Sequence, residues 1–145
     1  MPTYRSAAGL AALSVLLISA TGAAQAEPLL TKEDVEEVLG IAVVVDTRGA
    51  DGFSFTASKP VGSVTIDPLD AAVFAMMPKR PEAAIEGVGD EAFFQLDMAN
   101  TIVLQAVKGS SGFVLSVMFP MGIPPAITDL KATAVELAKI AAGKL

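Results

Sequence analysis

The spacing of apolar residues predicts most of the strands in this chain. Residues 53–58 read FSFTAS, so apolar and polar side chains alternate with the period of two that is typical of a half-buried strand. Other segments alternate more weakly or are rich in β-branched and aromatic residues. The predicted strands are 41–47, 53–58, 61–67, 92–96, 101–108 and 113–119. Short turns containing Asn or Gly separate the last three strands, which indicates a meander.

The first predicted helix covers residues 32–39. Thr31 suits the N-cap, and Asp34 stands three residues later as the acid of a capping box. Gly40 suits the position just beyond the C-terminal end. Most acids of this helix lie away from its narrow apolar stripe, so we expect them to face solvent.

Two further helices are predicted later in the chain. Asp67 and Pro68 have the residue types of an N-cap and a first helical position, so a second helix is expected to run from there through Met77. A final helix is expected after the prolines at 124–125, with Glu136 and Lys139 paired across one turn. Its apolar residues recur at steps of three and four: Ile127, Leu130, Ala134, Leu137 and Ala141.

This order of elements predicts the fold class. A helix, two or three strands, a helix, three strands and a last helix most simply form an antiparallel sheet with helices on one face. We therefore expect a single α+β domain, with about five to six strands and helices packed mainly on one face of the sheet.

The N-terminal segment has the pattern of an export signal. Residues 6–26 carry no charge, and the apolar stretch 7–20 is shorter than the roughly 20 residues that span a bilayer. Arg5 precedes this stretch, and Ala24-Gln25-Ala26 matches a signal-peptidase site. We expect cleavage after Ala26, a mature domain over 27–145 and a periplasmic or secreted location. The alternative is an accessory subunit tethered by a retained segment 7–20.

Charge and composition limit the expected partners and chemistry. The whole chain has a net charge of −6, and removal of residues 1–26 leaves −7. Nucleic acid and anionic membrane surfaces are therefore poor partners, and no membrane span is expected after cleavage. The sequence contains no His or Cys, which excludes Ser-His-Asp and Cys-His catalysis and histidine-ligated zinc or copper. We predict no metal and no cofactor.

The segment GVGDEAFF contains the candidate binding residues Gly87, Gly89, Asp90 and Glu91. It lacks the third glycine and the Lys-Ser/Thr pair of phosphate-binding loops. We interpret it mainly as a turn that leads into a core strand: the glycines allow unusual backbone angles, and Asp90 accepts a backbone N–H. The adjacent phenylalanines that follow are expected to point to opposite faces of the sheet.

Four segments carry a resemblance to a known group of proteins. They are LLTKEDVEEVLG, GVGDEAFF, TIVLQAVKGSSGFVLSV and ATAVELAKIAAGKL. Together they resemble small exported bacterial domains of unknown function, best represented by actinobacterial envelope lipoproteins. The resemblance implies the same fold and an envelope location, and it implies no reaction. This chain has no lipobox Cys and no internal Cys pair, so lipid anchoring and disulfides are not implied.

These observations give two expected functions. The first is an exported, non-enzymatic binding or accessory protein of the cell envelope, whose partner is an unknown envelope protein or a small ligand. The alternative is a carboxylate-dependent hydrolase acting on an envelope polymer, which requires two acids about 5 to 10 Å apart in one cleft. Asp90 and Glu91 are the most conspicuous acidic pair, although neighbours in an extended segment point to opposite faces.

Overall fold

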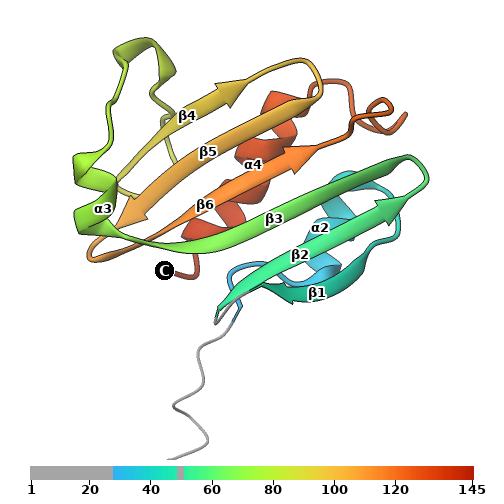
Figure 1. The fold of residues 1–145 in the computed structure, drawn as a ribbon, viewed down its shortest axis with the longest axis horizontal. Coiled ribbons are helices and arrows are strands. Elements are labelled where there is room, and N and C mark those ends of the chain that lie inside the picture. Colours follow the sequence, from blue (N-terminus) through green and yellow to red (C-terminus); the bar gives the residue numbers. More distant parts are fainter. Residues whose placement is uncertain (1–27, 49–50) are drawn as a thin grey trace, which may run out of the picture.

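A six-stranded antiparallel sheet forms the centre of the protein (Figure 1). The computed structural model describes residues 28–48 and 51–145, so the predicted signal peptide and its cleavage site lie outside the described residues. The strands are β1 (Val44–Arg48), β2 (Gly52–Ser58), β3 (Val61–Asp70), β4 (Glu91–Asp97), β5 (Thr101–Lys108) and β6 (Ser111–Met118). Their order across the sheet is β1-β2-β3-β6-β5-β4.

The sheet consists of two three-stranded meanders. Strands β1–β3 form one meander and β4–β6 the other, and their last strands, β3 and β6, pair antiparallel in the middle of the sheet. The first strand of each meander therefore lies at an outer edge. The predicted α+β class with an antiparallel sheet is confirmed.

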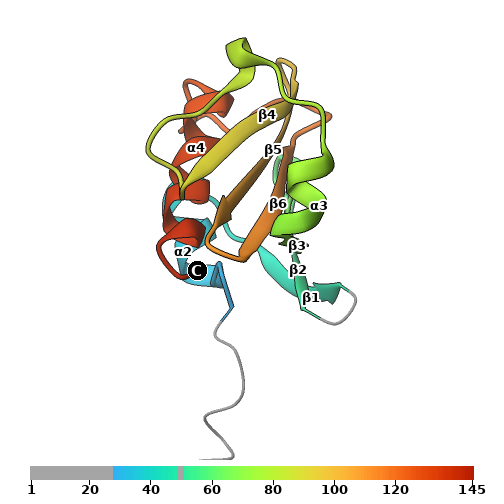
Figure 2. The same ribbon diagram turned by 90° about the vertical axis from the view of Figure 1, so that its left-hand side faces the viewer.

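Among the described residues, the two longer helices cover one face of the sheet. Helix α2 (Lys32–Leu39) lies behind the first meander and α4 (Leu130–Ala142) behind the second (Figure 1). The short helix α3 (Ala71–Met76) lies on the opposite face, as Figure 2 shows from the side. It is followed by the short 3₁₀ turn η1 (Pro81–Ala83).

The main core lies between the sheet and helices α2 and α4. Alternating residues of β6 supply its centre, because Phe113, Leu115 and Val117 are fully buried. From the helices, Leu39 and Leu137 enter the same core with 1% and 0% of their surface exposed. The helical spacing of the last predicted helix thus identifies its buried face correctly.

Strand β4 buries side chains on both faces of the sheet. Phe94 faces α4, where the ammonium of Lys131 lies 4.6 Å from its ring centre. Phe93 faces the other way, and its ring centre lies 5.3 Å from that of Phe74 in α3. The expected opposite orientation of the two adjacent phenylalanines is confirmed.

The first helix begins as the sequence predicts. The Thr31 hydroxyl accepts from the N–H of Asp34 at 3.1 Å, and the Asp34 carboxylate accepts from the N–H of Thr31 at 3.0 Å. Gly40 ends the helix in the left-handed conformation with φ 72°. Both halves of the capping box are therefore present.

The predicted start of the second helix is wrong. Asp67 and Pro68 belong to β3, and Asp70 is the N-cap of α3, accepting from the N–H of Ala72 at 2.7 Å. Pro68 pairs with Phe113 of β6, whereas the pairing of β3 with β2 ends two residues earlier, at Ile66. A proline is tolerated there because β3 needs main-chain partners on one side only.

Candidate functional site

The Gly87–Glu91 segment leads into β4 and touches the turn between β5 and β6. Gly87 and Gly89 have φ of 80° and 58°, which are left-handed values that favour glycine. A Cβ placed on Gly89 would lie 2.5 Å from the carbonyl oxygen of Val107. The segment therefore needs glycine at this position for both conformation and space.

Asp90 joins this segment to the β5–β6 turn. Its N–H donates to the carbonyl of Val107 at 2.8 Å, and its carboxylate accepts from the N–H of Gly109 at 2.8 Å. Asp90 thus accepts a backbone N–H as expected, but the donor belongs to a turn 19 residues away and not to its own turn.

Glu91 has a different partner. Its carboxylate lies 3.3 Å from the ammonium of Lys79, which also lies 4.5 Å from the ring centre of Phe74. Asp90 and Glu91 therefore point to separate elements. The pair does not form the common acidic cleft that the hydrolase alternative requires.

A hollow of about 240 Å³ lies beside the two glycines and the end of α4. Lys108 from the end of β5 and Lys139 from the last turn of α4 line it together with Asp90 and small residues. The Cε atom of Lys139 would lie 3.7 Å from a Cβ placed on Gly87, so this lysine chain passes close to the glycine. Three elements that are distant in sequence meet at this hollow.

Neither lysine of the hollow has an acidic partner within 4.0 Å among residues 28–48 and 51–145. The expected pair between Glu136 and Lys139 is also absent, because no contact within that distance joins their charged groups. The ion pairs that do form take up Arg48, Lys79, Lys131 and Lys144. Within the described residues, Lys108 and Lys139 therefore bring two positive charges without an ion-pair partner to one hollow, which Asp90 also lines.

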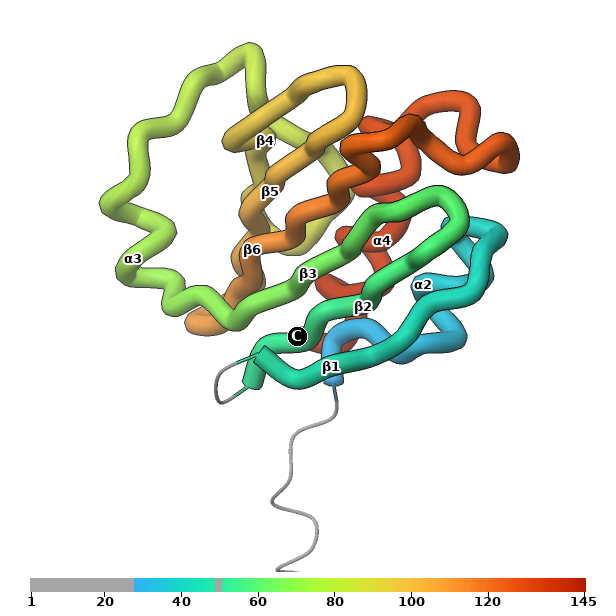
Figure 3. The backbone as a smooth tube through the Cα atoms, turned by 45° about the vertical axis from the view of Figure 1, so that its right-hand side comes forward, coloured from blue at the N-terminus to red at the C-terminus, as the bar shows by residue number. Residues whose placement is uncertain are grey.

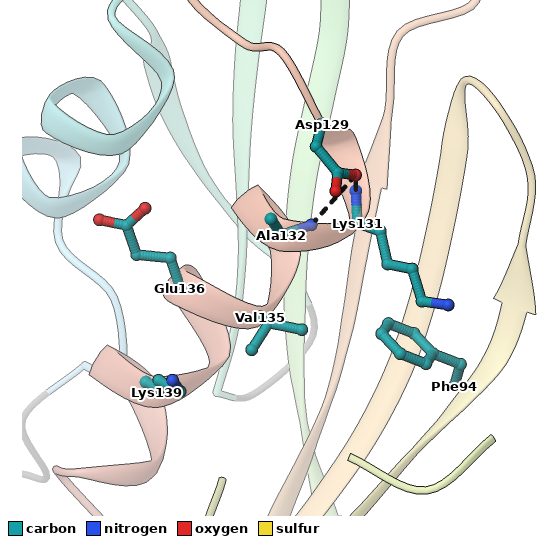
Figure 4. Close-up of a pocket in the computed structure, with 7 residues that line it drawn as sticks. All are labelled: Phe94, Asp129, Lys131, Ala132, Val135, Glu136 and Lys139. Atoms are coloured by element: carbon teal, nitrogen blue, oxygen red, sulfur yellow. Dashed lines mark hydrogen bonds between the residues drawn. The ribbon is translucent and has the colours of Figure 1, made fainter. Parts of the chain in front are cut away.

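A second, larger depression of about 420 Å³ continues from Lys139 along α4 (Figure 4). Phe94 and Val135 give it an apolar wall, and Lys131 extends over the Phe94 ring. Lys131 is also held 2.7 Å from the carboxylate of Asp97. We call the two depressions together the α4 groove. It combines a positive end at Lys108 and Lys139 with an apolar wall next to it.

Two acids, Asp129 and Glu136, also border the larger depression. Asp129 caps α4, accepting from the N–H groups of Lys131 and Ala132 at 3.0 and 3.4 Å. Glu136 follows seven residues later, which corresponds to about 10 Å along a helix axis. Asp129 is thus engaged by the helix, and this axial rise lies at the upper end of the separation of about 5 to 10 Å that the hydrolase alternative requires.

The sequence pointed to the glycines and to Asp90, but it did not point to the lysines. Lys139 resembled an ordinary lysine in the last turn of a helix, and Lys108 an ordinary strand end. Their proximity arises only from the packing of α4 against β5 and the loop before β4. The sequence alone carries no signal for this site, because the two lysines come together only in the tertiary structure.

Within residues 28–48 and 51–145, no three acidic, His or Cys side chains gather closely enough to hold a metal ion. In the same part of the chain, no helix has both the length and the apolar character needed to cross a membrane. Comparisons with protein-family models, with curated proteins and with solved structures give no match.

Proposed function

We propose that this protein is an exported, non-enzymatic binding or accessory protein of the cell envelope, and that its α4 groove binds an anionic group attached to an apolar moiety. The observation that carries the proposal is that Lys108 and Lys139 line one hollow without an acidic partner in the described part of the chain. The ligand is a small molecule or a segment of a partner protein with this chemistry.

The two lysines supply the attraction for an anion. A carboxylate or phosphate between two ammonium groups forms charge-assisted hydrogen bonds, which are about twice as strong as neutral ones. The adjacent Gly87 and Gly89 have no side chains that would keep the ligand away from the main chain. The apolar wall at Phe94 and Val135 then suits the uncharged part of the same ligand.

Negative potential next to the hollow makes both lysines necessary. Asp90 lines the hollow, and the C-terminal end of α4 carries the negative end of the helix dipole. The net charge of −7 over residues 27–145 adds a general repulsion of anions. One ammonium must therefore offset these effects before the other gives net binding, and loss of either lysine is expected to abolish most of the affinity.

The proposed location depends on the N-terminal sequence. The uncharged segment 6–26 and the Ala24-Gln25-Ala26 pattern support export with cleavage after Ala26. The resemblance to actinobacterial envelope domains supports the same location. Intact mass of the protein recovered from the source cell tests this part: a species that begins at Glu27 is expected, whereas a species that retains residues 7–20 would support the tethered alternative.

Binding is tested with the simplest anions. Amide NMR spectra are recorded while sodium phosphate or sodium acetate replaces sodium chloride at constant ionic strength. We expect saturable shifts centred on Gly87, Gly89 and Lys108, and the two anions distinguish a phosphate from a carboxylate preference. Lys139→Gln and Lys108→Gln should each weaken binding by about tenfold or more, as expected when a hydrogen bond to a charged group is lost.

Lys59→Gln is the matched control, because Lys59 is an exposed lysine in the turn between β2 and β3 and does not line the α4 groove. It should leave the shifts unchanged. Weak, non-saturable shifts in the wild type, or equal affinity in the wild type and in both groove variants, would contradict the proposed site. Recovery of a ligand or partner from the native envelope by wild-type protein, but not by Lys139→Gln, would then identify the natural occupant.

A further inference from the structure

Strand β1 has an uncovered outer side in the part of the chain that the structure describes. All five of its residues are exposed, and Val44 and Val45 retain 65% and 37% of their surface. In an antiparallel edge strand, alternate residues direct their N–H and C=O groups away from the neighbouring strand. β1 therefore offers main-chain hydrogen bonds to another extended chain.

The strand is regular enough to accept such a partner. It pairs with β2 in continuous register from Val44 to Arg48, without a bulge, and it contains neither proline nor lysine. Bulges, prolines and lysines are the usual means by which edge strands avoid pairing. A hollow of about 340 Å³ at the start of the strand, lined in part by Val44, Asp46 and Ala57, can take a side chain of the added segment.

Acidic side chains lie in this edge strand and at its start. Asp46 lies in β1, and α2, which carries several acids, lies behind the same strands (Figure 3). Glu36 of α2 reaches the start of the strand, where its carboxylate accepts from the N–H of Val43 at 2.9 Å. The single cation of β1, Arg48, is directed to Asp67 at 3.4 Å. The edge therefore presents negative charge to an incoming strand.

This charge argues against a second copy of the chain as the occupant. Two-fold antiparallel pairing centred on the strand would place Asp46 opposite Asp46 of the other copy, and like charges directly opposite are unfavourable. Other registers would still bring together two domains with a net charge of −7 each over residues 27–145. A segment of opposite charge meets neither obstacle.

We propose that the β1 edge binds an extended basic segment of a partner protein as an additional strand. Main-chain hydrogen bonds to β1 would provide much of the affinity, and lysine or arginine side chains near Asp46 and α2 would provide the selectivity. This surface is separate from the α4 groove, so the proposal does not depend on the function proposed above.

The test uses three heptapeptides, each labelled with a fluorophore: basic KVKVTVK, acidic EVEVTVE and KVKPTVK, whose proline removes a central N–H. Fluorescence anisotropy measures binding to the purified protein, and hydrogen exchange measures protection of the amides of β1. We expect the basic peptide to bind at least about tenfold more tightly than either of the others, consistent with one to two favourable charge or hydrogen-bond contacts. We also expect it to protect the amides of β1.

Asp46→Lys should weaken binding of KVKVTVK about fivefold or more, whereas Glu82→Lys, at an exposed acid of η1, should have no effect. Lys139→Gln should also have no effect, which separates this surface from the α4 groove. Equal affinity for the acidic peptide, or unchanged exchange of the β1 amides, would overturn the proposal. So would a concentration-dependent dimer, seen by sedimentation, in which the same amides are protected without peptide.

Discussion

The two edge strands of the sheet, β4 and β1, differ in whether other parts of the described chain cover their outer sides. At β4, residue Ala84 forms a bridge to Phe93, and the N–H of Ile85 donates to the carbonyl of Ala92 at 2.9 Å. A shift of register between Phe94 and Leu96 interrupts the strand farther along. At β1 the described residues form neither a cover nor a bulge. Within the described residues, one edge is thus closed by the chain itself, and the other remains able to pair.

The length of the preceding connection explains this difference. Residues 71–90 separate β3 from β4, which is enough chain to form α3 and η1 and then to run beside β4. Only residues 40–43 separate α2 from β1, so no chain is available there to cover the strand. Protection of the β4 edge thus depends on a long connection anchored by Phe74, and the connection before β1 is too short to do the same.

Removing that anchor should cause the largest effect. Phe74→Ala empties a site where the native ring is 2% exposed and packs on Phe93, so we expect a loss of about 3 to 5 kcal/mol in the free energy of unfolding, measured in urea. The amide of Ile85 should exchange faster as the cover of β4 loosens. Val73→Ala, on the exposed side of the same helix, should change stability by about 0.5 kcal/mol or less. Similar midpoints for the two variants would show that α3 does not anchor the cover.

Gly89, in the loop that leads into β4, provides the next test. Gly89→Ala should destabilise by about 1 to 2 kcal/mol for its left-handed conformation, and by more because the new Cβ meets the carbonyl of Val107. Gly109→Ala is the matched control: its φ is 64°, but a Cβ there has no neighbour within 4 Å. The difference between the two midpoints isolates the close contact. If the two variants are equally stable, the contact with Val107 relaxes without cost.

The strand pattern predicted most elements but not their places in the sheet. Segment 101–108 is β5 without change, because its apolar residues lie in the centre of the second meander. Segment 41–47 looked like a mostly apolar strand, yet all five residues of β1 are exposed and the strand begins only at Val44. β-branched residues favour extended structure at an edge as well as in a core, so the pattern alone does not reveal which neighbours a strand has.

The candidate site could also be predicted only in part from the sequence. The left-handed glycines could be predicted because the requirement is local, and Asp90 could be predicted as an acceptor because aspartate commonly serves turns. Its donor, Gly109, could not, since it belongs to another turn. The unpaired state of Lys139 could not be predicted either, because helical spacing allowed a pair with Glu136 that the side chains do not form.

Two substitutions of Asp90 test whether hydrogen bonding or charge holds the loop before β4 in place. Asp90→Ala removes the acceptor of the Gly109 N–H and should cost about 1 kcal/mol in urea unfolding. Asp90→Asn keeps a side-chain oxygen and should cost a few tenths of a kcal/mol or less. In the anion titration, Asp90→Asn should bind slightly more tightly because it removes a negative charge from the hollow. Loss of all binding in Asp90→Asn at an unchanged midpoint would instead identify the carboxylate as a ligand-binding group.

The smallest expected effect concerns the ion pair between Lys144, just after α4, and Asp34 of α2. The Lys144 ammonium lies 3.0 Å from the Asp34 carboxylate, and these side chains are 24% and 26% exposed. Partial burial alone would raise the pKa of Asp34, but the Thr31 N–H, Lys144 and the Thr31 hydroxyl stabilise the charged form and hold its pKa below the ordinary value of 3.8.

Because the folded pKa of Asp34 is the lower one, this carboxylate stabilises the fold above the ordinary value of 3.8, and the contribution is lost as pH falls through the folded pKa. Lys144→Ala should therefore cost about 0.5 to 1 kcal/mol near neutral pH, as a partly exposed ion pair does. The difference from wild type in urea midpoints should shrink once the pH is below 3.8. Lys32→Ala, at an exposed lysine of α2 that forms no ion pair within the described residues, is the control and should show no such trend. A gap for Lys144→Ala that stays constant into strong acid would mean that the lysine stabilises the α2–α4 contact by packing its carbon chain and not through Asp34.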